Sequence, residues 1–566
     1  MKSKSKHLVC VATFVAIALS GIAMAQQVPN AGDALRQAQP LPPPPATSQP
    51  ALPQIGGAAP IEPPMTALPA GPKVVVSALQ VYGNRVIATP VLTALVAGAA
   101  GQEMSLAELE SLAQRITRYY REHGYFVARA YIPAQEIVGG VVKIRVVEGN
   151  YGKFHLKNHS LVRDKTVQGM LDDVKSADIV SFNTLERAML IINDTPGAQV
   201  TRADVMPGEA VGTSDFAVET QATAPYNGYV MFDNYGSVYT GRDRFSFGVD
   251  ANSPTGLGDK LSLSGLVTEN GDLLNGRVAY SLPLADNGLR GGFSAGQTAY
   301  RLTDTYARLD ATGHATAVDV YLSYPIKRTE AQTVAITGDL GYKSLIDTIG
   351  AAGVHDPRTD LTATVALSLR DERVLLGFDG LTQASLGVTF GHLSFRDDTS
   401  EALDAAGADT RGEFGKLVAS LARTSVLTDR LFLHTSLSGQ YAIDGKSLDG
   451  TERMAVSGPG AVVAYPPDEL IGDSAVLAHL DLDGVLMRKG SYLWDALVFT
   501  DYGQAWENYA ADFPGMRHIA DVGLGLNVSG HGLFLHANLA HRLSSAAPVS
   551  EPYPRNKALV QLGWVF

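Results

Sequence analysis

Cysteine is almost absent from this chain, since Cys10 is the only one among 566 residues. A single thiol excludes an internal disulfide and any metal site built on several cysteines. Runs of Lys and Arg are absent as well, and the net charge of −12 at pH 7 argues against nucleic acid as a partner. After the N-terminal segment no apolar run is long enough for a membrane-spanning helix. These absences leave a soluble protein or a membrane β-barrel, whose alternating strands average to neutral hydropathy.

The N-terminal segment has the features of an export signal. A basic start is followed by an apolar run from Leu8 to Leu19, and Ala23-Met24-Ala25 then supplies a small-residue cleavage site before Gln26. This order predicts a signal peptide over residues 1–25 that is removed during export. Because Cys10 lies within it, the mature protein is expected to contain no thiol.

A short helix and a proline-rich segment come next. Residues 30–39 can form a helix with Asn30 or Asp33 as its cap. Proline recurs through residues 41–72, and this composition predicts an extended, semi-rigid tether and no packed core. A helix on such a tether can lie far from the domain that follows it. The alternative is a disordered leader, and composition does not separate the two.

Residues 73–222 have the pattern of two small α/β units, at 73–149 and 150–222. In the first unit a strand over 74–82 precedes a helix that begins with a capping box of Ser105 and Glu108. Two further strands are predicted over residues 125–132 and 141–147. The second unit has a similar order, and Asn183 with Glu186 predicts the start of a helix through Ile192.

Strand alternation dominates residues 223–566. Apolar Val334, Ile336, Leu340 and Tyr342, for example, alternate with polar or small residues. Strands of this kind also occur in soluble sandwiches. Two features favour a membrane barrel: the strands approach the length that a tilted membrane strand needs, and tight turns alternate with long polar loops.

The C-terminal strand supports the same interpretation. It ends on an aromatic residue and places Val560, Leu562, Trp564 and Phe566 on one face. The length of the region accommodates about sixteen strands with their connections. The predicted fold is therefore mainly β, with a transmembrane antiparallel barrel over residues 223–566 that leaves no strand edge unpaired in the bilayer.

Two stretches within the barrel region suggest an internal latch. Glu452 to Tyr465 contains glycine and proline and is typical of a loop. The stretch from Phe499 to Gly503 predicts a strand that places Phe499, Asp501 and Gly503 on one face. A buried or lumen-facing carboxylate beside a loop needs a partner, and the sequence alone does not identify it.

Patterns that would indicate an enzyme are weak. Gly292 to Gly296 matches G-x-S-x-G, but that motif requires a strand-to-helix turn and here lies within alternating strand. His531, His536 and His541 differ in parity and cannot share one strand face, which argues against a metal site. No P-loop occurs. We therefore expect no catalytic residue, no cofactor and no metal.

The chain resembles the two-partner secretion (TpsB-type) transporters, which include the haemolysin and filamentous-haemagglutinin exporters. The tethered helix and the proline-rich linker contribute to this resemblance, as do four groups of motifs. These are Gly124 to Gln135 with Val147-Glu148-Gly149; Leu185-Glu186-Arg187 with Pro196-Gly197 and Pro207-Gly208; Asp233-Asn234-Tyr235-Gly236; and Thr240-Gly241-Arg242. The resemblance implies that 73–149 and 150–222 are periplasmic polypeptide-transport-associated (POTRA) domains, with Tyr125, Pro133, Gln135, Glu148 and Gly149 as motif residues of the first.

The family signature V-R-G-Y, on the long sixth loop, matches this chain only in part. After Gly458-Pro459 the matching residues are Val462, Val463, Ala464 and Tyr465, so valine replaces the arginine and alanine replaces the glycine. In relatives the arginine pairs with the aspartate of F-x-D-x-G, which corresponds to Asp501 between Phe499 and Gly503. Valine supplies neither charge nor donor. Either another base such as Arg453 meets Asp501, or the loop is held differently.

The resemblance also implies a function and a location. An outer-membrane translocator of a Gram-negative bacterium would bind an unfolded, TpsA-like exoprotein through its POTRA domains and export it through the barrel without nucleotide hydrolysis. The helix at 26–40 would plug the resting pore. The other expected partners are outer-membrane lipid and, through Phe566, the barrel-assembly machinery. The alternatives are an insertase of the same superfamily and a passive porin.

Overall fold

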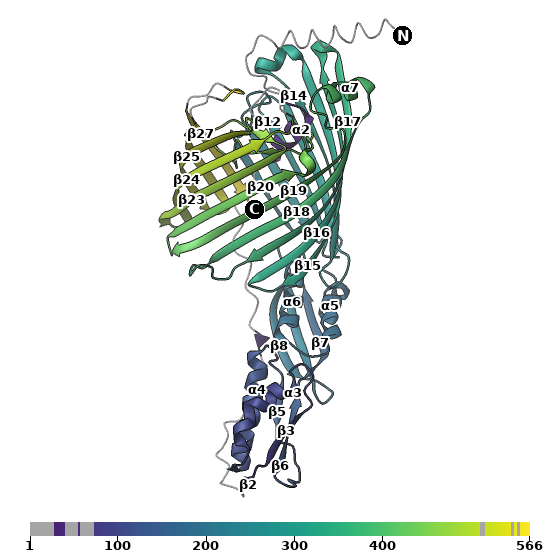
Figure 1. Ribbon diagram of the computed structural model, residues 1–566, viewed down its shortest axis with the longest axis vertical. Helices are drawn as coiled ribbons and strands as arrows, with labels where there is room; N and C mark the ends of the chain where they lie inside the picture. Colours follow the sequence, from purple (N-terminus) through teal and green to yellow (C-terminus); the bar gives the residue numbers. More distant parts are fainter. Residues whose placement is uncertain (1–27, 40–54, 57–72, 510–515, 545–547, 552–554) are drawn as a thin grey trace.

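The computed structural model describes residues 28–39, 55–56, 73–509, 516–544, 548–551 and 555–566. The expected signal peptide and nearly all of the expected linker lie outside the described residues. A large barrel occupies one end of the molecule, and two small α/β units extend from it in single file (Figure 1). No helix in the described part of the chain is both long and apolar enough to cross a membrane.

The first α/β unit packs two helices on a three-stranded sheet of order β3-β6-β5. The expected strand over 74–82 is divided, because β2 pairs with β4 whereas β3 pairs with β6. The capping box of Ser105 and Glu108 is present at the start of α4. The elements are β2 (Val74–Val75), β3 (Ala78–Tyr82), α3 (Thr89–Val96), β4 (Glu103–Met104), α4 (Leu106–Glu122), β5 (Arg129–Tyr131) and β6 (Val141–Val147).

The second α/β unit has the sheet order β1-β8-β9-β7, in which β1 comes from the region where a linker is expected. The start of α6 differs from expectation: its N-cap is Ser181, which accepts from the Thr184 N–H. Glu186 instead accepts a hydrogen bond from the backbone N–H of Glu330 in the barrel, at 2.8 Å. The elements are β1 (Ile55–Gly56), β7 (Asn150–His159), α5 (Asp164–Asp173), α6 (Phe182–Asn193), β8 (Gln199–Pro207) and β9 (Thr213–Gln221).

Sixteen strands of the described chain form a closed antiparallel barrel, which confirms the predicted mainly β fold. Large apolar side chains such as Leu340 and Val365 point outward and are well exposed, as a lipid-facing surface requires. The strands are β10 (Tyr226–Asp233), β11 (Arg244–Asn252), β12 (Lys260–Thr268), β13 (Leu273–Pro283), β14 (Arg290–Arg301), β15 (Ala311–Arg328), β16 (Gln332–Ile349), β17 (Val354–Asp371), β18 (Gly380–Phe395), β19 (Gly412–Thr428), β20 (Leu431–Ala442), β23 (Ser474–Lys489), β24 (Tyr492–Trp506), β25 (Met516–Gly530), β26 (Leu533–Arg542) and β27 (Asn556–Val565).

Two inward elements fill part of the barrel. Helix α2 (Ala31–Gln37) lies inside it, far from the α/β units (Figure 1). The long connection between β20 and β23, residues 443–473, also folds into the lumen and is called L6 below; it contains β21 (Met454–Ala455) and β22 (Ile471–Gly472). A further connection carries α7 (Asp398–Ala406) at the end of the barrel remote from the α/β units (Figure 1).

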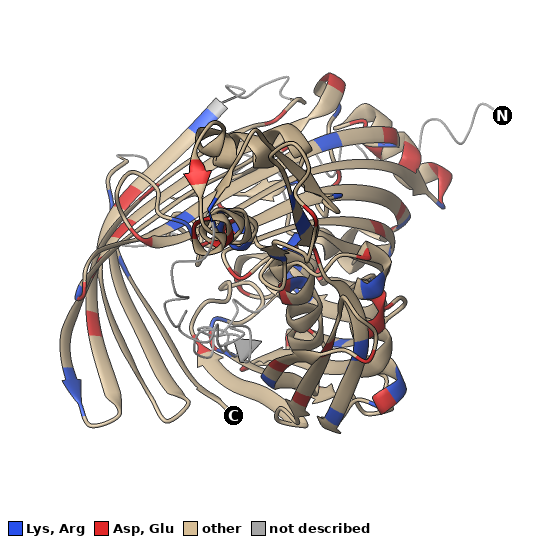
Figure 2. Cartoon of the chain, turned by 90° about the horizontal axis from the view of Figure 1, so that it is seen from below, with Lys and Arg blue, Asp and Glu red and all other residues tan. Residues whose placement is uncertain are grey.

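The second α/β unit is fastened to the near rim of the barrel. Arg328 forms a bidentate pair with Asp194, at 2.7 and 2.8 Å. Arg187 donates to the Pro325 carbonyl at 2.8 Å. In the view from below, the α/β units lie under one side of the barrel, and acidic and basic positions are distributed around its wall (Figure 2). This attachment fixes one side of the lumen entrance.

Candidate functional site in the barrel lumen

The tip of L6 is an apolar plug pressed against the barrel wall. Val462, Val463 and Tyr465 are buried, and they share a cluster with Phe499 of β24. Gly503 is needed where the two meet: a Cβ added there would lie 2.9 Å from Val456 Cβ and 3.0 Å from Val462 Cγ2. The structure therefore places the loop motif beside the wall motif, with valine at the position of the signature arginine.

Asp501 has a different partner from the one that the signature suggests. Its carboxylate, on a residue only 2% exposed, contacts Nδ1 of His479 on the neighbouring strand β23. The other ring nitrogen of His479 lies 3.0 Å from Asp481. Arg453, the base considered from the sequence, instead pairs with Asp473 at 3.2 Å. Asp501 is thus held by the wall itself.

The loop tip is bound by a second carboxylate, on Asp521. Asp521 of β25 lies directly opposite Asp501 in the strand register and accepts from the Ala464 N–H at 2.6 Å. The next carbonyl, that of Tyr465, accepts from Nζ of Lys557 on β27 at 3.0 Å. Sequence reasoning missed His479 and Asp521. Their positions opposite Asp501 become visible only when the register of three strands is known.

Helix α2 is capped at both ends by the barrel. Asn30 and Asp33 together form its capping box, so both candidate caps contribute. Asp347 of β16 accepts from the Ala31 N–H at 2.7 Å, and Arg244 of β11 donates to the Gln37 carbonyl at 2.8 Å. A carboxylate at the N-terminus and a cation at the C-terminus both complement the helix dipole.

The helix also binds L6, which joins the two lumen elements. Arg36 pairs with Asp468 at 2.9 Å and donates to the Gly450 carbonyl at 2.6 Å. Gln37 donates to Asp468 at 2.6 Å. On its other face, Ala31, Ala34 and Ala38 are buried against the wall. Together these contacts attach α2 to both L6 and the barrel wall.

The motif residues of the first α/β unit build its internal structure. Glu148 accepts from the Tyr120 hydroxyl at 2.7 Å and from the Arg85 and Val86 N–H groups at 2.7 and 3.0 Å. Burial, followed by the hydrogen bond to Glu148, raises the pKa of Tyr120. Gly149 has a φ of +80°, and a Cβ there would lie 2.6 Å from Val127 Cγ2.

The remaining motif residues of this unit lie near its sheet. Gln135 exchanges two hydrogen bonds of 2.8 Å with the backbone of Lys143 and so continues the β5–β6 pairing beyond β5. Pro133 offers its carbonyl to Gln135 at 3.3 Å, and Tyr125 packs edge-on against Tyr120.

The structure shows where the G-x-S-x-G match lies and how possible metal ligands are arranged. Ser294 of the G-x-S-x-G match lies in the middle of β14 and donates to Asp319 at 3.0 Å. It is not at a strand-to-helix turn, which the hydrolase motif requires. Within the described residues no group of three or more His, Cys, Asp or Glu side chains is arranged to hold a metal ion.

The chain matches two family models. Residues 212–528 match the haemolysin secretion/activation protein family ShlB/FhaC/HecB, and residues 74–149 match the ShlB-type POTRA domain. The chain belongs to the ShlB/FhaC/HecB family. It is a two-partner secretion transporter with a β-barrel in the outer membrane and N-terminal POTRA domains in the periplasm. Members of this family are transporters, not enzymes.

Individual relatives agree with this assignment. The chain is 28% identical to the heme/hemopexin transporter protein HuxB of Haemophilus influenzae (strain 86-028NP), over 80% of each chain. It is 26% identical to the outer membrane transporter CdiB of Dickeya dadantii, over 66% of this chain and 65% of that one. The solved structure of CdiB from Escherichia coli superposes with a TM-score of 0.72 at 21% identity, covering 91% of this chain and 94% of CdiB, and so shows the same fold.

Proposed function

We propose that this protein exports an unfolded, TpsA-like exoprotein through its barrel lumen without nucleotide hydrolysis. The observation that carries the proposal is the position of α2. A seven-residue helix that belongs to no strand and no loop of the barrel lies in the lumen and packs its alanines against the wall, which supports a closure of the resting pore. Its polar contacts and its small alanine face can be released without unfolding a single strand. A removable closure of this kind suits regulated passage of a chain.

We propose that the POTRA domains recognise the client. The edge strand β8 already pairs in parallel with β1, so that Ile55 lies opposite Ala203 and Gly56 opposite Asp204. This pairing supports recognition by β-augmentation, in which main-chain hydrogen bonds supply affinity with modest side-chain specificity. A client segment of extended conformation fits the same edge once β1 leaves it.

The barrel seam favours a route through the lumen over lateral insertion of other barrels. Strand β10 pairs with β27 from Tyr229 opposite Val565 to Asp233 opposite Gln561, and backbone hydrogen bonds between Gly228 and Phe566 continue this pairing at one end. Beyond that ladder, the side chain of Asn234 accepts from the Val560 N–H at 2.8 Å and donates to the Ala558 carbonyl at 3.2 Å. The side chain therefore extends the strand pairing and keeps the seam closed.

Two further partners belong to this proposal. The apolar outer face of the strands fits outer-membrane lipid. Phe566, whose ring is exposed beside Trp564 with centroids 4.9 Å apart, is proposed to be recognised by the barrel-assembly machinery. Its backbone N–H and carbonyl both bond to Gly228, so the C-terminus stays at the seam.

Secretion of the cognate exoprotein, with and without this gene, tests the proposal. Export predicts that the extracellular amount falls in the deletion strain and returns on complementation, while the assembly of other outer-membrane barrels is unchanged. Unchanged secretion would contradict the proposal, and a general loss of barrels would favour the insertase. Single-channel recording after deletion of residues 26–40 separates a porin, which should show no change, from a plugged translocator with larger or more frequent openings.

A further inference from the structure

The charged residues that attach L6 to the barrel wall precede its tip in the chain. Within the described residues, the tip from Val456 to Tyr465 carries no charged side chain. It contacts the wall through apolar packing, through two backbone groups, and through the Tyr465 ring, whose centroid lies 5.8 Å from the Arg542 guanidinium. The stem of the loop, in contrast, contains the buried carboxylates Asp449 and Glu452. Each of them meets cations of the barrel wall.

Glu452 joins L6 to two strands. The residue is 3% exposed and pairs with Lys343 of β16 and with Lys416 of β19, the latter at 2.9 Å. Lys416 also donates to the Glu452 carbonyl at 3.0 Å. Asp360 of β17 lies 3.2 Å from Lys343 and completes the network. One loop carboxylate is thus shared by two lumen lysines that lie on non-adjacent strands.

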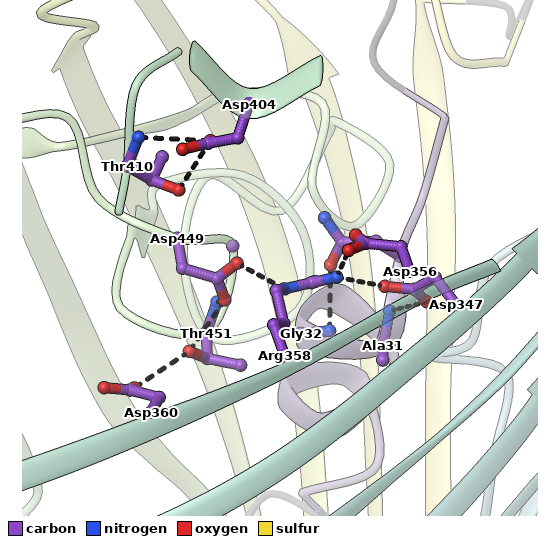
Figure 3. A network of polar contacts seen from close by, with 12 residues as sticks. Ala31, Gly32, Asp347, Asp356, Arg358, Asp360, Asp404, Thr410, Asp449 and Thr451 are labelled. Atoms are coloured by element: carbon purple, nitrogen blue, oxygen red, sulfur yellow. Dashed lines mark hydrogen bonds and ion pairs between the residues drawn. The ribbon is translucent and has the colours of Figure 1, made fainter. Parts of the chain in front are cut away.

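Asp449 makes the second connection, through Arg358 of β17. The guanidinium Nε lies 2.8 Å from Asp449, and Nη1 lies 2.7 Å from Asp347 and 2.8 Å from Asp356 (Figure 3). Asp347 is the carboxylate that accepts from the Ala31 N–H (Figure 3). Two carboxylates of the barrel wall therefore fix the position of the Arg358 guanidinium, and this fixed cation pairs with Asp449 of L6.

We propose that Glu452 and Asp449 are the positioning residues that hold L6 in the lumen, in place of the cation that is missing at Val463. The polarity of the attachment is reversed: the loop supplies carboxylates and the wall supplies Lys343, Lys416 and Arg358. Removing one member of a buried pair leaves an uncompensated charge, which is strongly unfavourable. The loop cannot leave this position without exposing two wall clusters that need its carboxylates.

Thiol labelling of the loop tip tests this proposal and does not depend on whether a client is exported. Val463→Cys in a Cys10→Ser background of the full-length protein places one thiol at a position that is 8% exposed. With the loop in place, a bulky maleimide should react slowly. Adding Glu452→Gln keeps the shape and removes the charge, and it should raise the labelling rate by about tenfold or more. Glu452→Asp should restore part of the protection.

The matched control is Glu401→Gln, which removes a carboxylate from an exposed pair with Arg411 on the outer connection. It should leave the labelling rate unchanged. Ala405→Cys on the exposed face of α7 gives the rate of an unprotected thiol. Heat-modifiable migration in gels confirms that each variant barrel is folded. The proposal is wrong if the thiol of Val463→Cys is labelled within twofold of the parent rate in both Glu452→Gln and Asp449→Asn, with both barrels folded.

Discussion

The backbone N–H of Ala464 donates to Oδ2 of Asp521 at 2.6 Å, and Asp521 lies directly opposite Asp501 on the next strand. A main-chain group of the loop tip thus binds the barrel wall beside Asp501. The donor does not depend on the identity of residue 464, which explains how alanine serves there. The two carboxylates have different partners, because His479 contacts Asp501 while Asp521 accepts the hydrogen bond from the loop.

Asp521→Ala should therefore release the loop tip. The Ala464 N–H would be left buried without its acceptor, which costs about 1–3 kcal/mol. Asp521→Asn keeps an acceptor oxygen and should cost less. The labelling rate of Val463→Cys measures the effect and should rise more for alanine than for asparagine. Asp495→Ala, on the neighbouring strand β24 and away from the loop, is the control; an equal rise there would mean that any lost wall carboxylate loosens the barrel.

The fold could be predicted from the sequence because its signals are local. Alternation along each strand and the capping box at Ser105 both depend on residues that are near one another in the chain. The partner of Asp501 could not be predicted, because His479 and Asp521 meet it only through the register of three strands. Glu186 shows the same limit: its spacing indicated a helix cap, but a contact with the distant Glu330 N–H determines its role.

Arg36→Ala should open the resting pore more often. The arginine contributes an ion pair with Asp468 and a hydrogen bond to the Gly450 carbonyl, which join α2 to L6. Its loss leaves the helix with its end caps and its alanine face. Planar-bilayer recording should show more frequent openings, with the deletion of residues 26–40 as the upper limit. Arg308→Ala, on an outer connection of the barrel, is the control. The prediction would be contradicted if Arg36→Ala opened as rarely as the parent.

Tyr120→Phe should change the alkaline stability of the first POTRA domain. Burial and Glu148 raise the pKa of Tyr120 above its ordinary value of 10.0. A raised folded-state pKa gives a contribution that is fully present below pH 10 and is lost as the pH rises further, since only the unfolded chain then releases the proton. The phenylalanine variant should be less stable at pH 7 by about 1 kcal/mol.

The measurement for Tyr120→Phe is urea-pulse proteolysis of the full-length protein between pH 7 and pH 11, following cleavage within residues 73–149. The difference between parent and variant should shrink above pH 10. A constant difference across this range would show that the hydroxyl contributes by packing alone. Tyr82→Phe, at an exposed position of β3, should show neither the loss at pH 7 nor the alkaline change.

Gly503→Ala should displace L6 by steric contact alone. The added methyl group would lie 2.9 Å from both Cβ and the carbonyl oxygen of Val456, closer than atoms of the two residues can approach. Overpacking of this kind costs about 1–3 kcal/mol when neighbours must move. Gly338→Ala in β16 adds the same methyl group where nothing lies within 4 Å, so it should leave L6 in place. We expect Val463→Cys to be labelled faster in the Gly503 variant and at the parent rate in the Gly338 variant. Equal rates in both variants would mean that the loop tip tolerates the contact by a small shift of β24.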